Sequence, residues 1–217
     1  MRNILLALAF VSTMTISRAE EEWTPLFDGK TLAGWSAPDG AAVEGWSVTE
    51  GGVLAFNGKG RMLLSDKEYS SFELEWEWKL AAGGNNGLKY WVTKIGGKEW
   101  LGIEYQMIDD LKHADALKGG SHSTGSIYDI FDVAKDKDLR PVGEWNRSRV
   151  VVKDGKIEHY LNGRLCSSAD TRSEAWKEHI AKSKFKSKTG FAPGHGKLML
   201  TAHGDPAWYR NIRIRPL

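Results

Sequence analysis

The sequence has a single cysteine, Cys166, among its 217 residues, so it cannot form an intramolecular disulfide and must be stabilised by a buried core. It also has no excess of one charge, because 30 lysines and arginines face 28 aspartates and glutamates. No basic stripe is present, and we therefore expect no nucleic acid partner. Internal repeats, linkers and low-complexity segments are missing as well, which indicates one domain.

Long apolar runs are also scarce, and the only marked one lies at residues 4–14, after the basic Arg2. It is too short to span a bilayer, and the small-x-small triplet Ser17-Arg18-Ala19 follows it. The sequence therefore predicts a signal peptide over residues 1–19 and export to the periplasm or the medium. We expect residues 20–217 to form a single domain that makes no membrane contact.

Ten tryptophans and 24 glycines are typical of short strands joined by turns. Residues 72–80 alternate strictly between apolar and polar side chains, which predicts a strand with one face in the core and the other in water. The expected core face has Phe72, Leu74, Trp76, Trp78 and Leu80, and the expected polar face has Glu73, Glu75, Glu77 and Lys79.

Turn and cap signals complete the predicted fold. Asp154-Gly155 and Asn162-Gly163 each separate two short apolar runs, as in β-hairpins. Ser173 can cap a helix over residues 174–182, and this is the one credible helix, near 173–183. The pattern predicts an all-β sandwich of two antiparallel sheets.

The segment 102–109 carries the main candidate site. In a strand Glu104 and Gln106 point to the same face, and a bulge near Ile108 would bring Asp109 to that face too. Two carboxylates and a carboxamide on one patch suit a sugar or a proton transfer, although a solvated strand face is the alternative.

Other candidates are weaker, because each has a structural alternative. Tyr90, Tyr128 and Trp145 can stack on a sugar or serve as packing residues. Asn146 can hold a ligand or a loop, and His203 lies in a polar strand end suited to ligand or metal. A divalent metal stays possible without a compact motif, and its weak candidate ligands are Glu104, Asp109, His122 and His203. His159 alternates with apolar residues, which favours a structural histidine in the core.

Several segments together resemble one family, the 3-keto-disaccharide hydrolase domains, from about Trp23 to Leu217. The matching segments are Leu26-Phe-Asp-Gly-Lys-Thr-Leu32, Gly34-Trp35, Phe72-Glu-Leu-Glu-Trp-Glu-Trp-Lys79, Asn85-Asn-Gly-Leu-Lys-Tyr90, Gly102-Ile-Glu-Tyr-Gln-Met-Ile-Asp-Asp110, Thr124-Gly-Ser-Ile-Tyr128, Gly143-Glu-Trp-Asn146, Glu158-His-Tyr-Leu-Asn-Gly163 and Tyr209-Arg-Asn-Ile-Arg-Ile214. The resemblance implies a concanavalin-A-like jelly roll that acts on glycosides oxidised at sugar carbon 3.

A ketone at carbon 3 acidifies the proton on carbon 2, so the bond at carbon 1 can break by elimination and water can then add. This route needs a base, an acid and a group that stabilises the enolate. We expect Glu104 and Asp109 to act as base and acid, Lys89 to stabilise the enolate, and Gln106 to orient sugar hydroxyls. Two alternatives stay open: a lectin-like module without catalysis, and a retaining glycosidase of the laminarinase type.

The sequence departs from the family pattern at two places. Asn86 stands where the family usually has serine, and Thr201-Ala202 stands where it often has glutamine and aspartate. If the missing carboxamide and carboxylate hold ligand or metal in relatives, these departures predict an altered substrate or activity.

The predicted cleavage site can be tested directly. After secretion from a bacterial host, we expect the mature chain to begin at Glu20, as measured by N-terminal sequencing and intact mass. A secreted chain that retained Arg2 would contradict the prediction, and Ala19→Arg, which removes the small residue before the cut, should leave the precursor unprocessed.

Overall fold

The computed structural model describes residues 22–217, so the predicted signal peptide lies outside the described residues. The strands are β1 (Thr24–Pro25), β2 (Trp35–Ser36), β3 (Trp46–Thr49), β4 (Val53–Asn57), β5 (Leu63–Tyr69), β6 (Phe72–Leu80), β7 (Asn85–Ile95), β8 (Glu99–Ile108), β9 (Asn146–Lys153), β10 (Lys156–Leu161), β11 (Arg164–Asp170), β12 (Gly196–Leu200) and β13 (Pro206–Pro216). The described part of the chain has one α-helix, α1 (Glu174–Lys182), and short 3-10 turns at Pro38–Gly40, Ala116–Lys118 and Gly120–His122.

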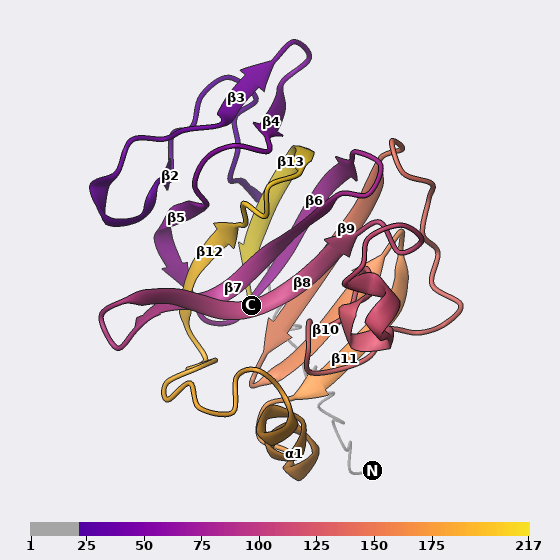
Figure 1. Cartoon of the computed structure of the whole chain (residues 1–217). Helices are drawn as coiled ribbons and strands as arrows, with labels where there is room; N and C mark the ends of the chain where they lie inside the picture. The colour runs from indigo at the N-terminus through magenta and orange to yellow at the C-terminus, as the bar shows by residue number, and fades with distance from the viewer. Residues whose placement is uncertain (1–21) are drawn as a thin grey trace, which may run out of the picture.

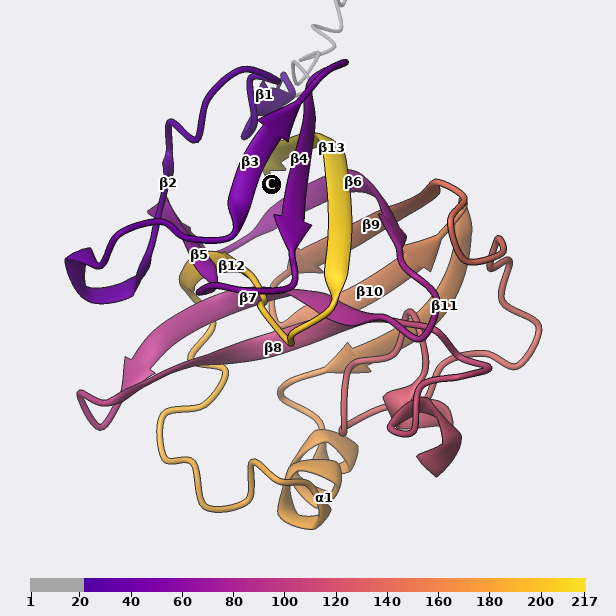
Figure 2. The same ribbon diagram turned by 45° about the horizontal axis from the view of Figure 1, so that its top comes forward.

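The strands form two antiparallel sheets packed face to face (Figure 1). The larger sheet has the order β11-β10-β9-β6-β13-β4-β3, with β1 paired to β13, and the smaller has the order β2-β5-β12-β7-β8. Figure 2 shows α1 to one side of the sandwich, away from β3 and β4. The predicted fold, an all-β jelly-roll sandwich with one short helix, is confirmed. No helix within residues 22–217 is long and apolar enough to cross a membrane.

The alternating segment forms β6 with the predicted bounds, and its apolar face is buried in the core. Its polar face differs from the expectation of a solvated surface, because Glu73 and Glu75 are buried. Arginines from the neighbouring strands cover them: Arg149 and Arg215 bind Glu73, and Arg147 and Arg213 bind Glu75. Paired charges therefore take the place of water on this face.

The predicted turns and helix cap are also confirmed. Asp154 and Gly155 have φ angles of 49° and 76°, as a two-residue hairpin between β9 and β10 requires. Ser173 caps α1, since its Oγ accepts a 3.1 Å hydrogen bond from the Trp176 amide. The prediction of a bulge near Ile108 is wrong. The β7–β8 register is regular from Asn85 opposite Ile108 up to Tyr90, and the shift lies in β7 between Tyr90 and Thr93.

One buried carboxamide, that of Asn86, joins the two sheets. Its Oδ1 accepts hydrogen bonds of 2.8 Å from Thr201 Oγ1 at the end of β12 and 2.8 Å from Tyr209 on β13 of the other sheet. Asn86 and Thr201, one residue from each departure from the family pattern, therefore contact each other inside the sandwich.

The long loop between β8 and β9, residues 109–145, covers the free edge of β8. Its backbone pairs with the strand through Gly125 to Gln106 at 2.9 Å and Tyr128 to Glu104 at 3.0 Å. His159 anchors the loop from the core, because its Nδ1 donates to the Gly125 carbonyl at 3.1 Å while Nε2 accepts from Tyr90 at 2.9 Å. The prediction of a structural histidine at this position is confirmed.

The contact between Asn86 and Thr201 predicts a compensating pair. Asn86→Ser should cost about 2 kcal/mol in urea unfolding, since Tyr209 loses its acceptor in the core. Adding Thr201→Gln returns a carboxamide to the same space, so the double variant should recover about 1 kcal/mol. A double variant whose loss equals the sum of the two single losses would contradict the pairing. Asn57→Ser, at the exposed end of β4, is the control.

His159 also makes stability depend on pH. Its burial lowers its pKa from 6.5 to about 4, so between these values the unfolded chain binds a proton that the folded chain does not. Stability should therefore fall by about 2 kcal/mol from pH 7 to pH 5, measured by urea unfolding. The His159→Gln variant should lose this pH-dependent decrease in stability. The His195→Gln variant, changed at an exposed position, should show the same decrease as the wild type. An equal fall in all three proteins would refute the assignment.

Candidate active site

The candidate site lies on the face of β7 and β8 that points away from the main core. Glu104 stands opposite Lys89, and Gln106 stands opposite Gly87. Glu104 is buried, with 3% of its side chain exposed, and its carboxylate lies 3.3 Å from Lys89 Nζ and 3.3 Å from His203 Nε2. The structure thus brings together Lys89, Glu104, Gln106 and His203, which the sequence analysis proposed as site residues.

The carboxylate fits against the sheet because Gly87 has no side chain. A Cβ at that position would lie 2.3 Å from Glu104 Oε1. Any larger residue would push the carboxylate away from the sheet, so Gly87 fixes the depth of Glu104.

Opposite charges keep the buried carboxyl ionised. Burial alone would raise the pKa of Glu104. The charge of Lys89 and the hydrogen bond and charge of His203 outweigh burial, with a further contribution from Lys184, and the pKa falls to about 2. His203 has 39% of its side chain exposed, so it reaches solvent while it holds Glu104.

Gln106 keeps one acceptor free beside this charge cluster. Its Nε2 donates a long 3.4 Å hydrogen bond to Asn85 Oδ1, and its buried Oε1 has no partner within the described residues. A buried acceptor without a donor is costly, so the arrangement suits a ligand hydroxyl at this point.

The long loop adds Tyr128 and an acid–histidine network. Asp115 Oδ2 accepts from the Tyr128 hydroxyl at 2.7 Å and lies 3.2 Å from His122 Nδ1, while His122 Nε2 lies 3.3 Å from Asp129 Oδ1. Desolvation and the bond to Asp115 raise the pKa of Tyr128 well above its usual range, so it stays a neutral phenol. The network fixes the Tyr128 ring beside the Glu104 cluster.

Lys184, which the sequence analysis did not predict, comes from the segment after α1. Its backbone N–H donates to Asp129 Oδ2 at 2.7 Å, and its Nζ lies 4.1 Å from the centroid of the Tyr128 ring. The surrounding sequence, with lysines at 182, 184, 186 and 188, contains no signal that separates this lysine from the other three.

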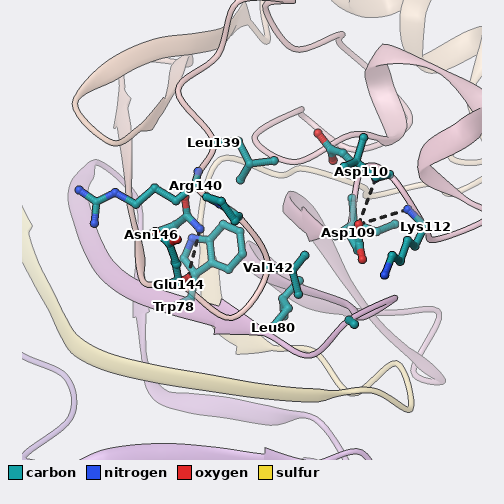
Figure 3. Close-up of a pocket in the computed structure, with 14 residues that line it drawn as sticks. Trp78, Leu80, Asp109, Asp110, Lys112, Leu139, Arg140, Val142, Glu144 and Asn146 are labelled. Carbon is teal, nitrogen blue, oxygen red and sulfur yellow. Dashed lines mark hydrogen bonds between the residues drawn. The ribbon is translucent and has the colours of Figure 1, made fainter.

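Asp109 does not join Glu104, which follows from the regular register of β8. Its carboxylate accepts hydrogen bonds from the backbone N–H groups of Gly83, Leu111 and Lys112 at 2.8, 3.1 and 3.2 Å and so holds two loops. It borders a separate, largely apolar pocket of 440 Å³ at the end of the sandwich. Figure 3 shows Asp109 and Asp110 on one side of this pocket and Arg140 and Asn146 on the other.

Three other predicted binding residues also lie elsewhere. Tyr90 is fully buried, with its hydroxyl on His159. Trp145 lies on the larger sheet, between Arg210 at 4.1 Å and Lys79 at 5.2 Å from its ring centroid. Asn146 is buried and holds the loop at Arg140 through a 3.0 Å hydrogen bond. Their residue types suit sugar binding, but the positions serve packing and loop support.

The four weak metal candidates do not converge. Glu104 and His203 are in contact, whereas Asp109 holds backbone amides and His122 binds Asp115 and Asp129. Within residues 22–217, no group of three or more histidine, cysteine, aspartate or glutamate side chains is placed to hold a metal ion.

Comparison with known proteins agrees with this framework. Residues 22–215 match the model of the 3-keto-alpha-glucoside-1,2-lyase-like domain. The chain is 28% identical to a 3-keto-disaccharide hydrolase of Bacteroides thetaiotaomicron, over 88% of this chain and 77% of that protein.

Two solved structures from Parabacteroides distasonis ATCC 8503, each of a candidate glycosyl hydrolase, have the same fold. The first has a TM-score of 0.82 at 32% identity and covers 90% of this chain and 94% of the other. The second has a TM-score of 0.71 at 28% identity and covers 90% and 100% of the two chains. Because the family model spans nearly all of the described residues, this chain belongs to the family of 3-keto-alpha-glucoside-1,2-lyase-like domains.

Proposed function

We propose that this protein cleaves the glycosidic bond of 3-keto-glycosides by elimination and hydration at the cluster formed by Glu104, Lys89 and His203. The observation that carries the proposal is a buried, ionised carboxylate in contact with a partly exposed histidine, 3.3 Å away, beside ammonium groups. The family membership and the name of the Bacteroides relative support the same substrate class.

Proton removal from carbon 2 is assigned to His203. A carboxyl whose pKa is about 2 is a weak base and cannot donate a proton near neutral pH. His203 lies 3.3 Å from this carboxylate and reaches solvent, and a carboxylate partner orients an imidazole and stabilises the imidazolium that forms when it takes a proton. Glu104 is therefore proposed as the orienting anion, and Asp109 takes no part.

The negative charge that develops on the oxygen at carbon 3 needs a cation. Lys89 lies on the neighbouring strand, directly opposite Glu104, and its side chain is 14% exposed, so little water screens its charge. The unpartnered Oε1 of Gln106 is proposed to accept a hydroxyl of the sugar ring, which fixes the sugar relative to His203.

In the proposed reaction the proton on carbon 2 moves to His203 and an enolate forms. The bond from carbon 1 to the glycosidic oxygen then breaks, and its electron pair leaves with that oxygen. Water adds its oxygen to carbon 1 of the resulting enone and gives up one proton, which balances the proton that the departed oxygen gains, while His203 returns its proton to carbon 2. The sum is hydrolysis, with the histidine restored.

The two alternatives find less support. A retaining glycosidase needs a second carboxylate about 5 Å from the first, and the Asp109 carboxylate binds backbone amides instead. A binding module without catalysis does not need an ionised group held against a histidine. The predicted leader at residues 1–19 leads us to propose that the reaction takes place outside the cytoplasm.

The proposal is tested with a 3-keto-glucoside beside the same glucoside unoxidised, by following free 3-keto-glucose. We expect release from the keto substrate alone. Glu104→Gln should lower kcat by about 100-fold, since His203 loses its orienting anion. Glu99→Gln, an exposed change on the same strand, is the matched control and should keep the wild-type rate.

Circular dichroism and thermal unfolding check that Glu104→Gln is folded. Full activity in this folded variant would remove the Glu104–His203 pair from the mechanism. Sugar binding without product from the wild-type protein would instead support the binding module.

A further inference from the structure

The ammonium of Lys184 lies in the candidate site without a hydrogen-bonding partner. Within residues 22–217 its Nζ makes no hydrogen bond or ion pair, and its contacts are the rings of Tyr128 at 4.1 Å and Phe185 at 5.1 Å. An ammonium has three donors, and an aromatic face satisfies none of them fully. These protons are therefore available to a bound molecule.

Two attachments hold Lys184 in this place. Its own backbone N–H donates to Asp129, whose carboxylate also lies 3.3 Å from His122 Nε2. The Tyr128 ring beneath the ammonium is fixed by its 2.7 Å hydrogen bond to Asp115. Both attachments come from the long loop, so the ammonium is positioned by the same loop that pairs with β8 at Glu104.

The proposed reaction still lacks a group that protonates the departing oxygen. Glu104 stays ionised, and Lys89 is bound to Glu104 and is already assigned to the oxygen at carbon 3. Tyr128 directs its proton to Asp115. Of the cationic and phenolic groups that surround Glu104, Lys184 is the one whose protons are not engaged by the protein.

We propose that Lys184 is a further catalytic residue, which donates a proton to the glycosidic oxygen as its bond to carbon 1 breaks. This inference rests on the proposed function. Desolvation of the ammonium lowers its pKa, which makes it a better acid near neutral pH.

The protons balance over the whole cycle. His203 takes the carbon 2 proton, and the electron pair of the broken bond goes to the glycosidic oxygen, which receives the Lys184 proton and leaves as an alcohol. The neutral amine then accepts a proton from the water whose oxygen adds to carbon 1. His203 protonates carbon 2, and both residues regain their starting states.

The test uses two 3-keto-glucosides that differ only in the leaving group, methanol or para-nitrophenol. Methoxide needs a proton to leave, whereas para-nitrophenolate does not. Lys184→Gln should therefore lose about 100-fold in kcat on the methyl glycoside and stay near the wild-type rate on the para-nitrophenyl glycoside. Lys184→Arg, which keeps the charge but is too weak an acid, should show the same split.

Lys186→Gln, an exposed change two residues away, is the matched control and should match the wild type on both substrates. Lys89→Gln should lose activity on both, because the enolate forms with either leaving group. An equal loss, or no loss, on the two substrates in folded Lys184→Gln would overturn the role of Lys184. Wild-type protein that releases nothing from either substrate would overturn the proposed function itself and this inference with it.

Discussion

The placement of the site depends on the hydrogen bonds that the Asn86 carboxamide accepts. It is fully buried, and its oxygen binds Tyr209 of the larger sheet and Thr201 of the smaller one. The same oxygen also accepts from the Gly87 amide at 2.9 Å, so it holds the backbone on which the Glu104 carboxylate rests. The spacing of the two sheets and the depth of the site are therefore set at one position.

The electrostatics of the site follow from this depth. A carboxylate on an open strand would be solvated and would have an ordinary pKa. Because Glu104 is buried against the backbone, it stays charged only with cations around it, and these come from three segments: β7, the turn after β12 and the segment after α1. The attraction between the Glu104 carboxylate and these cations also holds Lys89 and His203 in contact with it.

Much of the framework could be predicted from the sequence, because it depends on local rules. The alternation of apolar and polar residues predicted β6, and the two-residue period of a strand predicted that Glu104 and Gln106 share a face. The hairpin and cap signals predicted the turn at Asp154-Gly155 and the helix after Ser173. The predictions failed where long-range contacts decide. The regular register separates Asp109 from Glu104, and the packing around Trp145 and Tyr90 belongs to other parts of the sandwich. Lys184 could not be found, since only the folded loop distinguishes it from its neighbours.

The order of the strands has a consequence for the appearance of activity during synthesis and refolding. β13, the last strand of the chain, lies in the interior of the larger sheet between β6 and β4, and His203 lies in the short turn before it. Its pairing partner in the site, Glu104, is 99 residues earlier. Such distant contacts form late, because the intervening chain must be ordered first. A partly folded chain therefore lacks both the complete larger sheet and the contact between His203 and Glu104, so under the proposed function turnover reports complete folding of the domain.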